Sequence, residues 1–327
     1  MKSIRYYLGI DGGGTKTELA LADEQGNAVR SLFVAGCNPM DIGIDRTKQI
    51  LKSAIYEICG DIPLSSVNVF AGIAGGSSGS MKEQIAQFLK ELGFHAVGND
   101  SDSLNIIAAG LGQKDGVAVI MGTGICAFAQ SNGSLNRVAG WGYFFDNGGS
   151  AYNIGRDTIN AYYCALDGSG SPTILTEKIN AWMEENIISD LKKAETKSDL
   201  ESTPTHQLLL GRLYAGGKKL IASFAPMTFE AAHEGDEVAQ AIVQRNMAEA
   251  AHVIETAGKK LGDTQYPTPV VIAGGLTKQS MLLEYVSREL ENPELYRLKT
   301  LDCAPVIGAV NLACALDEKQ TSGADIK

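Results

Sequence analysis

A glycine-rich run near the start of the chain, DGGGTKT at residues 11–17, has the composition of a phosphate-binding loop. Glycine has no Cβ, so backbone N–H groups in such a run can approach an anion closely. Thr15 adds a hydroxyl donor, and the Asp11 carboxylate is an oxygen ligand suited to Mg2+. The run lacks the Walker A spacing, and it is no dinucleotide fingerprint because a strand should follow it. By itself it does not distinguish a phosphate loop from an ordinary hairpin.

Three further glycine turns follow apolar runs that we expect to be buried strands. Gly72, Gly75 and Gly76 follow residues 67–71, Gly122-Thr123-Gly124 follows 117–120, and Gly274-Gly275 follows 270–273. Ligands of α/β sheets collect at the carboxyl ends of strands. Four glycine turns at such ends therefore predict one cleft lined by backbone groups.

Two aspartates, Asp100 and Asp102, stand between an expected strand and an expected helix. An ionised carboxylate at this place can accept the proton of a hydroxyl that attacks phosphorus. The alternative is that either residue only caps the helix, because aspartate is common at N-caps. The residue types alone leave both interpretations open.

The order of these motifs resembles the BadF/BadG/BcrA/BcrD-type ATPase family, and within it the N-acetylglucosamine kinases most closely. GIDGGGTKT is followed by an aspartate at a helix start, then MGTG, AGWG, GGSAY and AGG, over nearly the whole chain. The resemblance implies an α/β fold of two ribonuclease-H-like domains, of the actin/hexokinase-like ATPase type, around a central cleft for ATP and substrate. It also implies an ATP-dependent sugar kinase that uses Mg2+.

The resemblance further implies roles for single residues. Phosphate loop one comprises Asp11, Gly13, Gly14 and Thr15, with Lys16 added to the nucleotide site and Asp11 as the metal ligand. Phosphate loop two comprises Gly122, Thr123 and Gly124, and Gly274 and Gly275 meet the adenosine. The sugar is expected to contact Asn38, Gly140, Trp141, Gly142 and Asn147. Trp141 can pack under the sugar or fill the core, and we favour backbone contacts from the two glycines beside it.

The helix that follows the family's catalytic aspartate has an apolar pair and then small residues, which matches the sequence after Asp102. Counting from Asp100 instead would place Asn105 at a core position. We therefore assign catalysis and a sugar contact to Asp102, with Asp100 as second choice or helix cap.

Asn147 departs from the N-acetylglucosamine kinases, which carry an acidic residue at this place. Asp146 stands one position earlier. An amide can still bond a sugar hydroxyl, and it donates as well as accepts. The sequence leaves open which of the two residues contacts the sugar.

The elements that would position these residues form two similar halves. Each half opens with strands and a glycine turn and then passes into helices. We expect an N-terminal domain over residues 1–112, with a helix over 305–327 packing back on it. A C-terminal domain over 113–304 would carry a mostly helical insertion, including a charge-rich stretch near 190–197 that should face solvent.

Composition narrows the function classes further. The 327 residues carry a net charge of −10, which disfavours nucleic acid as a partner, and no apolar run is long enough to cross a membrane. No leader sequence is evident, so we expect a cytoplasmic protein. The six scattered cysteines include no C-x-x-C pair, and most are expected to be reduced core thiols. The expected partners are ATP, a small-molecule sugar and a second copy of the chain in a homodimer.

The substrate expected from the resemblance is N-acetylglucosamine, with N-acetylmuramate or glucosamine as close alternatives. A second hypothesis is an ATPase that activates a partner enzyme. Family members of that type hold an iron–sulfur cluster with cysteines, and the scattered cysteines here argue against it. A third hypothesis is a non-catalytic sugar or nucleotide sensor. We expect no DNA-binding helix-turn-helix beyond either end, which disfavours a role in transcription.

Overall fold

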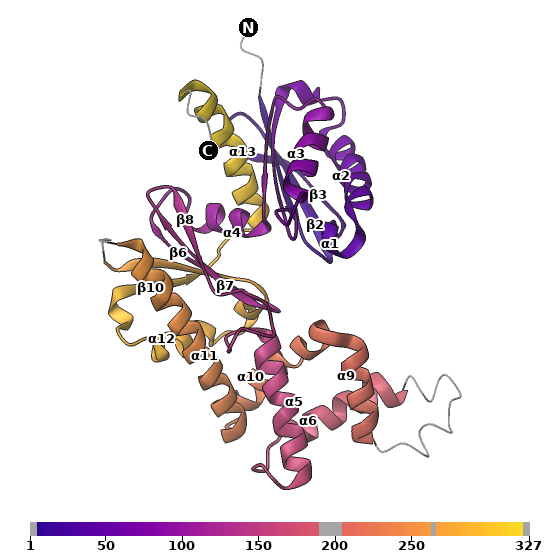
Figure 1. Cartoon of the computed structure of the whole chain (residues 1–327), viewed down its shortest axis with the longest axis vertical. Helices are drawn as coiled ribbons and strands as arrows, with labels where there is room; N and C mark the ends of the chain where they lie inside the picture. Colours follow the sequence, from indigo (N-terminus) through magenta and orange to yellow (C-terminus); the bar gives the residue numbers. More distant parts are fainter. Residues whose placement is uncertain (1–4, 190–204, 263–265, 323–327) are drawn as a thin grey trace. The chain divides into compact units, whose positions relative to one another are not determined.

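The computed structural model describes residues 5–189, 205–262 and 266–322. The charge-rich stretch near 190–197 and the last five residues of the expected C-terminal helix lie outside the described residues. The chain forms two compact units, Met1–Lys114 with Leu301–Lys327, and Asp115–Thr300 (Figure 1). Over the described residues no helix is long and apolar enough to cross a membrane.

The first unit contains a five-stranded sheet in the order β3-β2-β1-β4-β5. β1 (Tyr6–Gly12), β2 (Lys16–Ala22) and β3 (Ala28–Ala35) form an antiparallel meander. β4 (Val67–Ile73) and β5 (Ala96–Asp100) run parallel to β1. The carboxyl ends of β1, β4 and β5 therefore lie at one edge of this sheet.

Helices cover both faces of the first sheet, as Figure 1 shows. Leu8 and Ile10 of β1 point to the face covered by α2 (Ile44–Cys59) and α3 (Met81–Glu91), whereas Tyr7 points to α13 (Pro305–Ser322). This division follows from the alternation of side chains along a strand. The short α1 (Pro39–Ile42), η1 (Leu64–Ser66) and α4 (Asp102–Gly110) complete the unit.

α13 crosses α4 at a glycine. A Cβ at Gly308 would lie 1.8 Å from the carbonyl oxygen of Asn105 and 2.6 Å from the amide nitrogen of Ala109. Because the side chain of Gly308 is a single hydrogen, the backbones of α13 and α4 can come into direct contact. The close crossing fixes α4, and with it the residues that follow β5.

The second unit repeats the same sheet, in the order β10-β9-β6-β7-β8. β6 (Gly116–Met121), β7 (Ile125–Ser131) and β8 (Ser134–Val138) form the meander, and β9 (Thr268–Ala273) and β10 (Tyr296–Thr300) run parallel to β6. Strand order and directions match those of the first unit, which confirms the expected pair of ribonuclease-H-like folds. Sequence patterning did not reveal β10.

Helices fill the rest of the second unit. α11 (Glu237–Gly258) packs on the sheet through residues such as Met247, Ala250 and Ile254. A separate core joins α5 (Ala151–Asp167), α6 (Leu175–Met183) and α9 (Thr205–Ala222). The remaining elements are α10 (Ala225–His233), α12 (Leu282–Glu289), η2 (Glu184–Ile188), η3 (Lys259–Leu261), η4 (Gly275–Lys278) and η5 (Pro293–Leu295).

Candidate active site

Phosphate loop one forms the tight turn between β1 and β2. The Gly13 N–H donates to the Lys16 carbonyl at 2.9 Å, and the Gly13 carbonyl accepts from the Cys37 N–H at 3.0 Å. Gly14, Thr15 and Lys16 are exposed at the tip. The turn is therefore held at its base while its tip stays accessible to an anion.

Asp11 precedes this loop and is held by a residue that sequence analysis did not assign to the site. Asn105 on α4 is fully buried, and its Nδ2 donates to Asp11 Oδ1 at 2.8 Å and to the carbonyl oxygens of Ile10 and Gly72 at 3.2 Å. The expectation that an asparagine would avoid the core here was wrong, because three acceptors satisfy its amide nitrogen. Its Oδ1 has no hydrogen-bond partner within the described part of the chain.

Gly72 makes this arrangement possible. Strand β4 extends two residues beyond the predicted end, so Gly72 lies inside the strand and not in the turn. A Cβ at Gly72 would lie 2.1 Å from Asn105 Oδ1. Glycine at this position therefore leaves room for the Asn105 side chain beside Asp11.

Burial raises the pKa of Asp11 from 3.8 to about 6. The negative charge of Asp102 adds to this rise, whereas the hydrogen bond from Asn105 opposes it. A desolvated carboxylate of this kind gains stability from a cation. Asp11 and Asp102 therefore share one electrostatic environment at the carboxyl edge of the first sheet.

Asp102 and Asp100 differ in their surroundings. Asp102 is the first residue of α4, where desolvation raises its pKa although the Ser103 backbone N–H opposes the shift. Among the described residues no cation pairs with it. Asp100 ends β5, and its carboxylate binds Lys82 at 2.6 Å and the Ser101 N–H at 2.7 Å. Of these two carboxylates, Asp102 is therefore the one that is available to accept a proton.

Asn38 lies against the same loops. Its Oδ1 accepts from the Met40 N–H at 2.9 Å as the N-cap of α1, and its Nδ2 donates to Asp41 at 3.1 Å. A Cβ at Gly75 would lie 2.5 Å from Asn38 Oδ1, and a Cβ at Gly14 would lie 2.8 Å from Asp41 Oδ2. The first unit thus brings together Asn38, loop one and the turn after β4.

In the second unit, phosphate loop two and the predicted adenosine turn lie side by side. Gly274 has a φ of +100°, and a Cβ there would lie 2.5 Å from the Met121 carbonyl oxygen and 3.1 Å from the Gly122 amide nitrogen. The Gly122 N–H donates to the Gly124 carbonyl at 2.9 Å, which closes the turn. Thr123, Gly124, Gly274 and Gly275 are exposed.

The start of α5 supports loop two. The N–H groups of Ala151 and Tyr152 donate to the carbonyls of Gly122 at 2.8 Å and Thr123 at 3.3 Å. The first N–H groups of a helix lack partners within the helix, so these bonds satisfy both the helix and the loop. These two hydrogen bonds also hold loop two in place, with its carbonyl groups directed toward α5.

The predicted sugar segment joins β8 to α5. Gly140 and Gly142 have φ angles of +75° and +118°, and a Cβ at Gly140 would lie 2.5 Å from the Cβ of Cys126. Trp141 is 71% exposed, with the Arg137 guanidinium 5.2 Å from the centre of its ring. Trp141 therefore does not fill the core.

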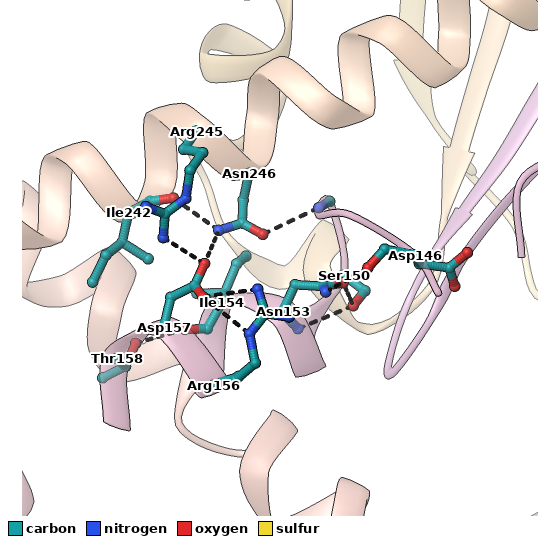
Figure 2. Close-up of polar contacts among 11 residues, drawn as sticks. Asp146, Ser150, Asn153, Ile154, Arg156, Asp157, Thr158, Ile242, Arg245 and Asn246 are labelled. Atoms are coloured by element: carbon teal, nitrogen blue, oxygen red, sulfur yellow. Dashed lines mark hydrogen bonds and ion pairs between the residues drawn. The ribbon is translucent and has the colours of Figure 1, made fainter. Parts of the chain in front are cut away.

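Asp146 and Asn147 behave differently within this segment. The Asp146 carboxylate accepts from the Trp141 N–H at 3.2 Å. Its carbonyl accepts from the Asn153 side chain at 3.0 Å (Figure 2). Asn147 is exposed. Asp146 thus braces the segment from within, and Asn147 is the residue that faces solvent.

A sequence model of the BadF/BadG/BcrA/BcrD ATPase family matches residues 8–313. The chain is 27% identical to the N-acetylmuramic acid/N-acetylglucosamine kinase of Clostridium acetobutylicum, over 95% of this chain and 98% of the relative. It is also 27% identical to the N-acetyl-D-glucosamine kinase of Dictyostelium discoideum, over 94% of this chain and 97% of the relative.

Solved structures share the fold. The crystal structure of a candidate N-acetylglucosamine kinase from Chromobacterium violaceum superposes with a TM-score of 0.70 at 23% identity, covering 95% of this chain and 99% of that one. A glucokinase of the ROK family from Streptomyces griseus, in complex with glucose and AMPPNP, gives a TM-score of 0.53 at 17% identity, with 95% and 98% coverage. At these identities the likeness concerns the fold alone.

Proposed function

The chain belongs to the BadF/BadG/BcrA/BcrD ATPase family, and from this premise we propose that it is an ATP-dependent kinase that phosphorylates a hydroxyl of an amino sugar. The relatives matched over nearly their full length are named as kinases of N-acetylglucosamine, and one also of N-acetylmuramic acid. The proposed substrate is therefore N-acetylglucosamine, with N-acetylmuramate or glucosamine as alternatives.

The observation that carries the proposal is the pair of carboxylates at one edge of the first sheet. Asp102 is desolvated and has no cation among the described residues, whereas Asp11 is fixed by Asn105 beside a phosphate-type turn. In the proposed reaction a sugar hydroxyl oxygen attacks the γ-phosphorus of ATP, its proton passes to the Asp102 carboxylate, and ADP leaves. A raised pKa makes Asp102 a better proton acceptor than an exposed aspartate.

Mg2+ fits the residues present. The described residues contain no group of three or more His, Cys, Asp and Glu side chains that would form a complete protein cage for a metal. Kinase Mg2+ is instead held by one or two carboxylates together with the nucleotide phosphates, and Asp11 is suited to be that carboxylate. When bound, the ion would neutralise charge on the transferring phosphoryl group.

The remaining predicted residues have consistent roles in this proposal. Backbone groups at Gly13–Thr15 and at Gly122–Gly124 would bind phosphate oxygens, and Gly274 and Gly275 would lie against adenosine. Asn38, Gly140, Trp141, Gly142 and Asn147 would contact the sugar. Because Asp146 already accepts the Trp141 N–H, we assign the sugar contact to Asn147.

The test is release of ADP from ATP against a panel of N-acetylglucosamine, N-acetylmuramate, glucosamine and glucose, with a reaction lacking sugar as the control. We expect turnover that depends on an amino sugar. Equal turnover without sugar would overturn the kinase proposal and support an ATPase that acts on a partner. Binding of sugar and nucleotide without any turnover would instead support a sensor.

The proposal extends to a homodimer in the cytoplasm. The six cysteines occur as thiols, which suits a reducing compartment. Light scattering coupled to size exclusion tests the assembly directly. A single species at the mass of one 34.6 kDa chain would contradict the homodimer.

A further inference from the structure

The sugar segment, residues 139–149, is held in place by polar contacts more than by its own apolar side chains. Trp141, Phe144 and Phe145 are 71%, 77% and 78% exposed, so these large side chains do not anchor it. Within the segment, the Gly142 carbonyl accepts from the N–H groups of Phe145 at 2.8 Å and Asp146 at 3.0 Å. Tyr143 packs against Tyr152 of α5, with their ring centres 4.8 Å apart, and polar contacts near the ends of the segment complete its placement in the unit.

One such contact comes from Asn246 on α11, 97 residues away in sequence. Asn246 is 1% exposed, and its Oδ1 accepts from the Gly149 N–H at 3.1 Å (Figure 2). Its Nδ2 donates to Asp157 Oδ2 at 3.0 Å and to the Ile242 carbonyl at 2.9 Å. All three bonds require the same orientation of the amide, so Asn246 is locked.

Asp157 on α5 continues this connection. Its Oδ2 also accepts from Arg245 at 2.7 Å, and its Oδ1 accepts from Arg156 at 2.9 Å. The Asp157 side chain is only 11% exposed, whereas those of Arg245 and Arg156 are 64% and 47% exposed, so these charge-assisted bonds are buried at the carboxylate end only. The carboxylate thus ties α5 to α11 at the level of Asn246 (Figure 2).

α5 itself connects the sugar segment to phosphate loop two. Asn153 in its first turn donates to the Asp146 carbonyl at 3.0 Å, and the preceding N–H groups of Ala151 and Tyr152 bind the carbonyls of Gly122 and Thr123. The glycine at 149 has a φ of +82°, and a Cβ there would lie 2.7 Å from Ile125 Cδ1. Because it has no side chain, Gly149 lets the backbone pass closely between α11 and the sheet, where a Cβ would clash.

We propose that Asn246 is a positioning residue for the sugar site, and that it acts with Asp157 to hold the sugar segment in a fixed place relative to phosphate loop two. This inference rests on the proposed function, because it takes residues 140–147 as sugar contacts. Asn246 does not touch the sugar in this account. It fixes the Gly149 N–H, and through it the end of the segment that carries Asn147.

The experiment compares Asn246→Leu with Val243→Ala. Val243 is buried in the same core on the same helix and has no polar side-chain atom, so its substitution reports loss of stability alone. We expect Asn246→Leu to raise the KM for N-acetylglucosamine by roughly tenfold to a hundredfold, because small misplacements of contacts reduce productive binding strongly. The ATP dissociation constant measured without sugar should change by less than about twofold, since backbone groups of α5 still hold loop two.

A second readout does not depend on catalysis. Hydrogen exchange in the peptide that covers residues 146–150 should be at least about tenfold faster in Asn246→Leu than in wild type, and unchanged in Val243→Ala. If Asn246→Leu does not fold, Asn246→Ser takes its place, because a serine side chain is too short to reach Gly149 and bonds within its own helix.

The possible results distinguish a failure of the positioning role of Asn246 from a failure of the proposed kinase function. Unchanged exchange at residues 146–150 in the Asn246 variant overturns the positioning role, whatever the wild type phosphorylates. An unchanged KM, or a KM that rises equally in Val243→Ala, overturns it as well. A wild-type protein without sugar-dependent ADP release overturns the proposed function instead, and with it the sugar part of this inference.

Discussion

Asp100 and Asp102 lie two positions apart, yet their carboxylates have different partners. Asp100 is bound by Lys82 and the Ser101 N–H, whereas Asp102 is desolvated and pairs with no cation among the residues that the structure describes. We expect Asp102→Asn to lower kcat about 10²–10⁴-fold, the usual effect of losing a positioned base. ATP binding should stay within about twofold of wild type. Asp100→Asn is the matched control, and a larger loss of kcat there than at Asp102 would reverse the assignment.

Asp11 gives a prediction on stability and pH. Its folded-state pKa of about 6 exceeds 3.8, so the folded protein holds a proton that the unfolded chain loses between these values. Ionisation at Asp11 therefore makes the wild type less stable as pH rises from about 4 to about 6. Asp11→Asn keeps the acceptor for Asn105 and removes this effect.

The variant should thus unfold at higher urea concentration than wild type at pH 7.5, by at most about 3 kcal/mol in free energy, and with little difference at pH 4.5. Catalysis should be lost at the same time, as expected where an active site stores unfavourable charge. Equal urea midpoints at both pH values would show that Asp11 is well solvated in the folded protein.

The glycine turns differ in whether the surrounding structure leaves room for a side chain in place of the glycine hydrogen. A Cβ at Gly124 meets no atom of the described residues within 4 Å, and the φ of Gly124 lies outside the left-handed region, so Gly124→Val should fold normally. A branched side chain would nevertheless prevent backbone N–H groups from approaching phosphate. We expect weaker ATP binding by about tenfold or more, measured by calorimetry. Wild-type affinity in a folded Gly124→Val protein would remove loop two from the nucleotide site.

The crossing of α4 and α13, by contrast, leaves no room for a side chain. Gly308→Ala would place a methyl group 1.8 Å from the Asn105 carbonyl oxygen, where only backbone movement can relieve the clash. The free energy of unfolding should fall by about 3 kcal/mol or more. Gly211→Ala in α9 meets no described atom within 4 Å and should raise stability by about 0.5–1 kcal/mol. Similar effects of the two substitutions would mean that the helices separate easily at this crossing.

Across the whole molecule, six thiols report on the fold. Cys37 and Cys59 are buried, and burial raises the pKa of each to about 11, while Cys126, Cys164, Cys303 and Cys314 are half-buried. At pH 8 a thiol with a pKa near 11 is about 0.1% thiolate, so it reacts slowly. A thiol reagent should therefore modify at most four of the six thiols rapidly in the native protein. In urea, all six thiols should react. Rapid reaction of five or six native thiols would contradict the closed core of the first unit.

The sheet order of the first unit is repeated in the second unit. Both units arrange their five strands in the same order and with the same directions. In each unit, the predicted phosphate loop follows the strand that comes first along the chain. Sequence patterning found the first four strands of each unit and the fifth only in the first. β10 alternates half-buried and exposed residues at the edge of its sheet, so its letters YRLKT lack the apolar run that marks the others.

The glycine turns, the strands that precede them and the family could all be predicted from the amino-acid sequence. These features depend on neighbouring residues, since glycine and apolar runs specify turns and buried strands locally. Which polar side chains are buried beside these turns depends instead on contacts between distant parts of the chain. Asn105 meets Asp11 across 94 positions, and Asn246 meets Gly149 across 97. An asparagine becomes acceptable in a core only when distant backbone and carboxylate groups satisfy it, and no local pattern records where those groups will be.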